Sequence, residues 1–293
     1  MPPSSRLGLV SAFSAFLIWG LLPLFWKQLS HVAAIDVIAY RIIWTTIFAG
    51  VVLAATRQLH SVANLFTDRR RFAFTLAASF FISLNGLTFV WGVTHDRVSE
   101  VSLGYYINPL LNALLGAVVL KERTTPMQTI AIAIALLGVS VPLYAVGALP
   151  WVSLVLAMCF GMYGLIRKLS PAEALPGLCG EMLLATPIAL GWLALRPPAP
   201  FDAFINQGIG TSALLILSGI ATAVPLVLFA FGARRIPYTT VGLLMYTTPT
   251  LQLLLAVAVY DEPFTWTQGL TFGLIWLAIA LYAWGSRSRS PVE

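Results

Sequence analysis

Charged residues are absent from long stretches of this chain, and no other feature constrains the fold as strongly. Six segments contain no Asp, Glu, Lys or Arg: 7–26, 72–95, 101–120, 203–233, 236–260 and 263–286. Over all 293 residues, 10% are charged and 59% are hydrophobic, whereas about 25% of a soluble domain is charged. Such a chain cannot cover its apolar residues with a polar surface, so most of it must face lipid. The composition excludes a soluble globular protein and a nucleic-acid-binding protein.

The apolar segments are long enough to cross a bilayer, which takes about 20 residues in a helix. The run 124–166 is twice that length and carries Gly147 and Pro150 near its middle, so we expect two helices joined by a turn. Segments 35–56 and 174–195, which carry Arg41 and Glu181, each add a span. The sequence therefore predicts an all-α integral membrane protein with ten transmembrane helices.

The distribution of Lys and Arg predicts the orientation of these helices, because positive residues stay on the cytoplasmic side. With the N-terminus inside, thirteen of the 17 Lys and Arg residues fall on the cytoplasmic side and four outside. We therefore expect both termini in the cytoplasm.

The chain repeats itself at an offset of 140 residues. Matching pairs at this offset are Tyr106 and Tyr246, Pro109 and Pro249, Glu122 and Glu262, Thr125 and Thr265, and Gln128 and Gln268. Leucine-rich helices can align by chance, but the Pro, Glu and Gln matches at one offset argue against chance. We predict two five-helix repeats, 1–146 and 147–293. An odd number of helices per repeat inverts the second copy in the membrane, as in many secondary transporters.

Polar side chains recur at corresponding depths of the two repeats, where such groups usually face a cavity or a partner helix. Tyr105, Asn108 and Asn112 lie three and four residues apart, hence on one helix face. Paired helices interrupted by proline point to a transport site. The predicted lining of a central cavity is Trp19, Asn85, Tyr105, Asn108, Asn112, Tyr163, Tyr246, Thr248 and Gln252, with helix breaks at Pro109 and Pro249. The alternative is that these side chains hydrogen-bond helices together and the prolines make ordinary kinks.

Two charged residues within spans, Arg41 and Glu181, are themselves related by the offset of 140. Each lies roughly 9–10 Å deep, from opposite membrane faces, so we do not expect them to pair. We predict that each helps to form the gate of its own half, with Glu181 as a proton or cation binder. The alternative is a snorkelling Arg41 and a packed, protonated Glu181.

Catalytic motifs are missing from the sequence. It has no G-x-S-x-G nucleophile motif, no H-E-x-x-H pair and no glycine-rich phosphate loop. We expect no enzymatic activity, no cofactor and no metal site.

Three segments resemble the RarD-type permeases of the EamA branch of the drug/metabolite transporter superfamily: FLIWGLLPLFWKQLSHV (16–32), SLGYYINPLLNALLGAVVLKER (102–123) and FGMYGLIRKL (160–169). The resemblance implies a bacterial inner-membrane (plasma-membrane) exporter of small metabolites or drugs, built from two inverted five-helix repeats. The RarD name implies a phenotype related to chloramphenicol. No acidic residue lies in the first span, where the small cationic-drug exporters of the superfamily keep theirs, so a cationic-drug antiporter is less expected.

Residues and resemblance together predict a secondary transporter that exports a neutral or zwitterionic amphipathic metabolite, such as an amino acid, by alternating access, with drugs as a side activity. The alternative is a non-transporting membrane sensor or assembly partner. The expected partners are a small-molecule substrate and the lipid bilayer, with no nucleic acid. The small residues Ala131, Ala133, Ala135 and Gly138 allow close helix packing. This packing is expected either between the two chains of a homodimer or within one chain.

Overall fold

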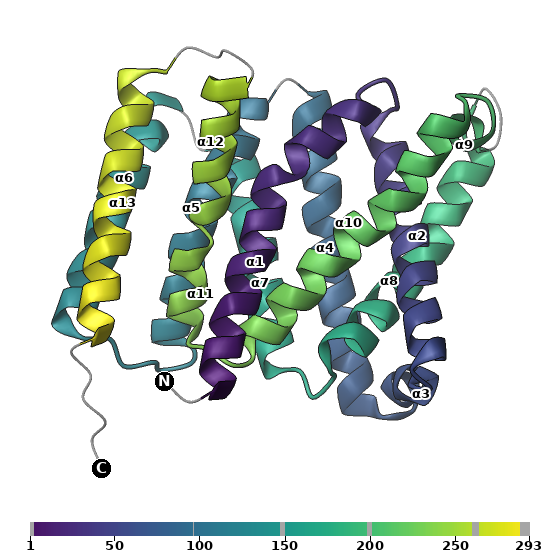
Figure 1. The fold of residues 1–293 in the computed structure, drawn as a ribbon, viewed down its shortest axis with the longest axis horizontal. Helices are drawn as coiled ribbons and strands as arrows, with labels where there is room; N and C mark the ends of the chain where they lie inside the picture. The colour runs from purple at the N-terminus through teal and green to yellow at the C-terminus, as the bar shows by residue number, and fades with distance from the viewer. Residues whose placement is uncertain (1–2, 96, 147–149, 198–200, 260–263, 288–293) are drawn as a thin grey trace.

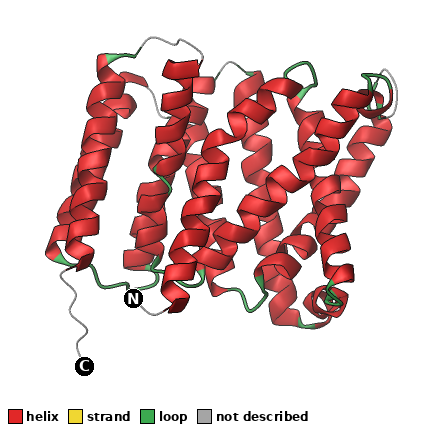
Figure 2. Ribbon diagram, viewed as in Figure 1, coloured by secondary structure: helices red, strands yellow, loops and turns green. Residues whose placement is uncertain are grey.

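The computed structural model describes residues 3–95, 97–146, 150–197, 201–259 and 264–287. Long helices stand side by side in one bundle (Figure 1), and the described residues contain helices and loops but no strand (Figure 2). The first helix begins and the last one ends at the same face of the bundle, the lower face in Figure 1.

Within the described residues, each half contains five long helices and two short ones. The first half has α1 (Pro3–Trp26), η1 (Lys27–Leu29), α2 (Ala34–Ala55), α3 (Leu59–Thr67), α4 (Arg69–Thr94), α5 (Val98–Val118) and α6 (Pro126–Val146). The second half has α7 (Trp151–Leu169), α8 (Ala174–Leu195), α9 (Asp202–Ile205), α10 (Ile209–Ala233), α11 (Tyr238–Leu244), α12 (Thr247–Val259) and α13 (Trp266–Arg287).

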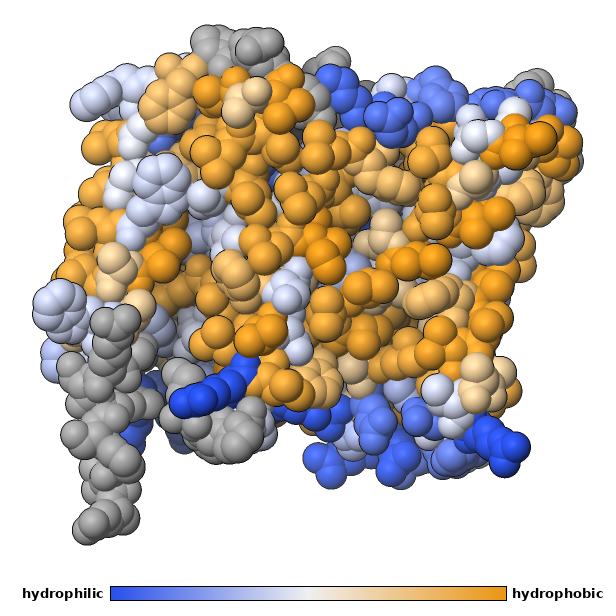
Figure 3. Space-filling view, in the orientation of Figure 1, coloured by the Kyte–Doolittle hydropathy of each residue, from blue (hydrophilic) through white to orange (hydrophobic). Residues whose placement is uncertain are grey.

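The bundle has the surface of a membrane protein. Eight helical stretches are long and apolar enough to cross a bilayer, and α5 and α6 contain shorter apolar stretches, Leu103–Val118 and Pro126–Val141. Figure 3 shows hydrophobic residues across the middle of the molecule and hydrophilic residues along its lower edge and part of its upper edge. The prediction of an all-helical membrane protein is confirmed.

The repeat produces the same local structure in both halves. At the start of α6, the Thr125 backbone N–H donates to Gln128 Oε1 (2.9 Å) and the Gln128 N–H donates to Thr125 Oγ1 (3.3 Å). Thr265 and Gln268 make the same two bonds at the start of α13, at 2.8 and 3.3 Å. This capping box satisfies N–H groups that have no partner within the helix. The residues matched at the offset of 140 therefore form the same helix start in both halves.

The helices that contain Pro109 and Pro249, which match at the offset of 140, differ. Helix α5 runs through Pro109 as one helix, so the predicted helix break at Pro109 is wrong. In the second half the helix is interrupted between Leu244 and Thr247, and Pro249 is the third residue of the helix that follows, α12. Because Pro249 has no N–H, it cannot donate a helical bond to the carbonyl four residues before it. The predicted run 236–260 is therefore two helices, α11 and α12.

Helix packing joins the two halves along the whole bundle. Helix α1 packs against α10 and α12, α4 against α7 and α8, α2 against α8 and α10, α5 against α7 and α11, and α6 against α13. Small residues of α6 allow its close approach to α13: Ala131 and Ala135 are fully buried, and a Cβ added at Gly138 would lie 3.2 Å from the Thr271 carbonyl oxygen. This part of the small-residue stretch is used inside the chain.

Candidate substrate site and gates

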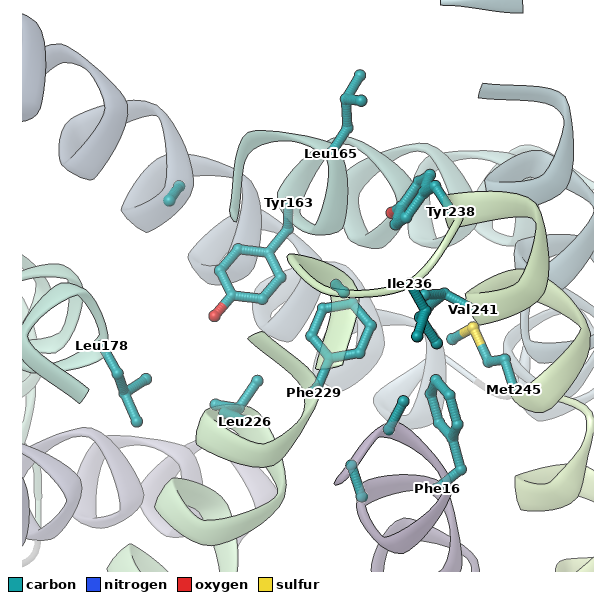
Figure 4. Packing of buried hydrophobic residues seen from close by; sticks show 14 of the residues in the cluster. Phe16, Tyr163, Leu165, Leu178, Leu226, Phe229, Ile236, Tyr238, Val241 and Met245 are labelled. Atoms are coloured by element: carbon teal, nitrogen blue, oxygen red, sulfur yellow. The ribbon is translucent and has the colours of Figure 1, made fainter. Parts of the chain in front are cut away.

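The middle of the bundle is filled by an aromatic cluster where α1, α7 and α10 meet. Phe16, Tyr163 and Phe229 are fully buried and lie close together (Figure 4), with ring centroids 6.0 Å apart for Phe16 and Phe229 and 6.3 Å for Tyr163 and Phe229. Trp19 packs on the cluster, 5.7 Å from both Phe160 and Phe229, and stays partly exposed. The predicted lining residues Trp19 and Tyr163 therefore contact the same ring, Phe229.

Two asparagines on the predicted face of α5 have different surroundings. The Asn112 side chain is fully buried; its Nδ2 donates to Met245 Sδ (3.4 Å) and its Oδ1 accepts from the Tyr238 hydroxyl (3.1 Å). Asn108 is 4% exposed, and its Oδ1 has no hydrogen-bond partner in the part of the chain that the structure describes. Asn112 thus joins α5 to the second half, whereas Asn108 keeps a free acceptor inside the bundle.

Three other predicted lining residues also hydrogen-bond across the two halves. Asn85 Nδ2 donates to the Leu156 carbonyl at 2.9 Å, and the Thr248 hydroxyl donates to the Phe16 carbonyl at 3.0 Å. The Tyr246 hydroxyl donates to the carbonyl of Tyr106 at 3.3 Å. These contacts hold helices together, as the alternative interpretation expects. Of the remaining members of the set, Tyr105 is exposed and Gln252 is partly exposed.

Glu181 lies in a buried ion pair that the sequence did not predict. Its Oε1 accepts from Arg167 Nη1 at 3.0 Å and its Oε2 from the Tyr163 hydroxyl at 3.2 Å, and both charged side chains are at most 1% exposed. Arg167, one of the thirteen Lys and Arg residues assigned to the cytoplasmic side, belongs to the last turn of α7. Its spacing of four residues from Tyr163 places both on one helix face, the one signal that could have revealed this contact. Gly177 of α8 leaves room for the guanidinium, because a Cβ there would overlap it.

Arg41 has different partners from Glu181, so the two charges related by the repeat do not pair. Arg41 Nε donates to Thr222 Oγ1 of α10 at 2.9 Å, and its guanidinium carbon lies 5.0 Å from the centre of a Trp26 ring. The Arg41 side chain is partly exposed although α2 is a candidate span.

An ion pair links the halves near the loops that precede α2 and follow α8. Asp36 Oδ2 accepts from Arg196 Nε at 2.6 Å, and Asp36 Oδ1 accepts from Trp192 Nε1 at 2.9 Å. Beside it lies a cavity of about 210 Å³, whose walls include His31, Asp36, Tyr40, Arg196 and Asp202.

A second polar contact links the halves at the opposite end of the bundle. Glu122 accepts from the backbone N–H groups of Tyr238 (2.6 Å) and Thr239 (2.9 Å), so it caps α11 across the halves, and Lys168 Nζ lies 3.8 Å from its Oε1. The repeat counterpart, Glu262, lies outside the described residues. Nearby, Arg234 donates to the Ala172 carbonyl at 2.6 Å. Burial, followed by the charge of Arg167, lowers the pKa of the Arg234 guanidinium.

Comparisons with known proteins identify the class. The chain matches the EamA-like transporter family twice, over residues 6–144 and 149–284. It is 42% identical over 289 residues to an uncharacterized transporter, PA0485, of Pseudomonas aeruginosa, which covers 98% of this chain and 97% of the relative. It is 36% identical to Protein RarD of Streptomyces exfoliatus, covering 98% and 93%. A solved crystal structure superposes with a TM-score of 0.73 at 19% identity, covering 96% of this chain and 98% of that one, which shows the shared fold.

The chain therefore belongs to the EamA-like transporter family, whose members are multi-pass membrane proteins. Within that family it is a RarD-type permease of the drug/metabolite transporter superfamily, and its place is the bacterial inner membrane.

Proposed function

We propose that this permease is a secondary transporter that exports a small amphipathic metabolite, such as an amino acid, by alternating access, with drugs as further substrates. One observation carries the proposal: residues 140 apart in sequence contact one another. Thr46 and Thr186 share a hydrogen bond of 2.9 Å between their hydroxyls, and the Tyr246 hydroxyl bonds the Tyr106 carbonyl at 3.3 Å. A residue meets its own counterpart only near an axis that relates two like units.

Helix packing supports the same arrangement. When each helix is exchanged for its counterpart in the other half, the α1–α10 contact becomes the α7–α4 contact, and both are present. Helix α2 packs on its own counterpart α8, and α6 on α13. The two family matches divide the chain at the same place. These facts support ten helices in two inverted repeats, 1–146 and 147–293, with both termini cytoplasmic, and inverted repeats are the usual basis of alternating access.

The proposed substrate cavity lies between the repeats, and its lining is the nine-residue set predicted from the sequence. The free acceptor of Asn108 supports this, because an unpaired buried polar atom is costly without a partner. Arg41 and Glu181 are proposed to act at the gates of their own halves. The inter-half contacts of Asp36 and of Glu122 lie at opposite ends of the bundle, where an alternating opening has to separate the halves.

Uptake into proteoliposomes tests this function. Purified protein is reconstituted and given labelled amino acids, chloramphenicol or a cationic dye, with and without an imposed proton gradient, beside protein-free liposomes. Saturable flux of the amino acids is the expected result. If folded protein moves none of the three classes, the transporter proposal fails and a sensor or assembly role becomes the better one.

A further inference from the structure

Arg41 carries a charge that no carboxylate balances within the described residues. The four ion pairs of that part of the chain involve Arg97, Arg167, Lys168 and Arg196. The Arg41 contact with Thr222 is to a neutral hydroxyl, and that hydroxyl donates its own proton to the Ser218 carbonyl at 2.8 Å. The terminal nitrogens of Arg41 have no hydrogen bond among the described residues, although a guanidinium has five N–H groups to donate.

The guanidinium points into the bundle. Thr222 is 6% exposed on α10, and Trp26 ends α1, so the Nε bond and the ring contact place the charge among interior helices. Arg41 is the eighth residue of α2, which places it about 10 Å below the start of the helix. A snorkelling arginine faces headgroups or water, whereas this one lies between both halves and is still partly accessible.

A fixed positive charge at this depth is costly unless a counter-charge is present during the working cycle. A carboxylate brings one negative charge and two oxygens in a plane, which matches one guanidinium bidentately. A phosphate brings up to two negative charges, one more than a single guanidinium balances. The aromatic ring of Trp26 provides an apolar surface beside the charge.

We propose that Arg41 binds the carboxylate of the transported solute. This inference rests on the proposed transport function and narrows it: the substrate is an anion or a zwitterion with a carboxylate, and a solute that is only cationic is not bound at Arg41.

Equilibrium binding to purified protein in lipid nanodiscs tests the proposal. The probes are the twenty protein amino acids and 3-phenylpropionate, followed, for each compound that binds, by its amide and by the amine that lacks the carboxylate. The wild-type protein is expected to bind the carboxylates at least about tenfold more tightly than the matched amides. Arg41→Gln removes this preference, and Arg41→Lys, which keeps the charge but not the planar fork, gives an intermediate value.

Arg97→Gln is the matched control. Arg97 also lies over tryptophan rings, at 5.7 Å from Trp91 and 5.8 Å from Trp151, but it already pairs with Glu100 at 3.0 Å. Carboxylate affinity should stay at the wild-type value in this variant. If Arg41→Gln does not fold, the ratio of carboxylate affinity to amide affinity in the wild type and in Arg41→Lys still tests whether Arg41 binds the carboxylate.

Three outcomes overturn the assignment: equal affinity for carboxylate and amide in the wild type, an unchanged preference in a folded Arg41→Gln protein, or no binding of any carboxylate in the set. Uptake by the same preparations separates this proposal from the transport function. Saturable uptake that Arg41→Gln leaves intact rejects the Arg41 assignment and keeps the transporter. Arg41-dependent carboxylate binding without uptake keeps the assignment and rejects the transporter.

Discussion

The carboxylate of Glu181 is buried between α7 and α8, where it accepts hydrogen bonds from the Arg167 guanidinium and the Tyr163 hydroxyl. The sequence of segment 174–195 predicts the depth and the charge of Glu181, but it does not predict its partner. Arg167 stands next to Lys168 at the end of an apolar run, a pattern that is typical of a loop. Contacts such as this one depend on how α7 lies against α8, which no local pattern specifies. The sequence likewise shows that Asn108 is polar, but it does not predict that its Oδ1 has no hydrogen-bond partner within the described residues.

The Arg167–Glu181 pair should be far more sensitive to losing one member than to losing both. Arg167→Met leaves a buried carboxylate alone and should lower the free energy of unfolding by about 3–5 kcal/mol. The double variant Arg167→Met, Glu181→Met should recover most of that loss. Thermal unfolding in detergent compares the three proteins, and a double variant no more stable than the single one would contradict this interpretation of the pair.

If Glu181 takes up a proton during transport, Glu181→Gln should flatten the pH dependence of the transport rate, since an amide cannot titrate. Proteoliposome uptake over a series of pH values measures this. An unchanged profile together with a lower unfolding temperature would assign Glu181 a structural role only.

The two asparagines of α5 should respond differently to alanine. Asn108→Ala should reduce transport while expression and unfolding temperature stay near wild type, because Oδ1 supports no recorded bond within the described chain. Asn112→Ala removes bonds to Met245 and Tyr238 and should cost about 1–3 kcal/mol of stability. Transport at matched protein levels and unfolding temperature are measured for both variants; equal destabilisation would favour the helix-linking interpretation for Asn108. Gln252→Ala is expected to behave like Asn108→Ala.

At the scale of elements, apolar runs predict helices well because a lipid-facing chain must satisfy its backbone hydrogen bonds internally. The sequence indicated an interruption by Pro249, and the structure shows it as the gap between α11 and α12. The short helix α3 was not predicted: its buried positions, Val62 and Leu65, lie three residues apart in a segment with polar neighbours and too few residues for a span. Its amphipathic spacing was the available signal.

Gly242 should be essential for the contact between α11 and α5. A Cβ there would lie 2.4 Å from the Pro109 carbonyl oxygen and 2.9 Å from the Ala113 nitrogen, both backbone atoms that cannot rotate away. Gly242→Ala should therefore lower stability by about 1–3 kcal/mol through overpacking. Gly273→Ala on α13 is the control, since a Cβ there meets nothing within 4 Å and alanine favours the helix. Unfolding temperatures of the two variants are compared; similar values would show that α11 does not pack this closely.

At the scale of the molecule, the composition of the chain predicts the fold class, and the residue matches at an offset of 140 predict the repeat. The polar contacts at the two ends of the bundle could not be predicted, since they pair unlike residues: Asp36 with Arg196, and Glu122 with the start of α11. The offset replaces Asp36 by Pro176 and Arg41 by Glu181. The halves therefore share a backbone plan while each carries its own polar groups.

The central claim is that one unit occurs twice in opposite orientations, and sided labelling tests it most directly. Ala33 and Glu173 are exposed, related by the offset of 140, and precede α2 and α8. Cysteine is placed at either position, and intact cells are treated with a membrane-impermeant maleimide; the parent protein is the control, because its Cys159 and Cys179 are buried. The account predicts labelling of Ala33→Cys in intact cells and of Glu173→Cys only after permeabilisation. Labelling of both from the same side would contradict it.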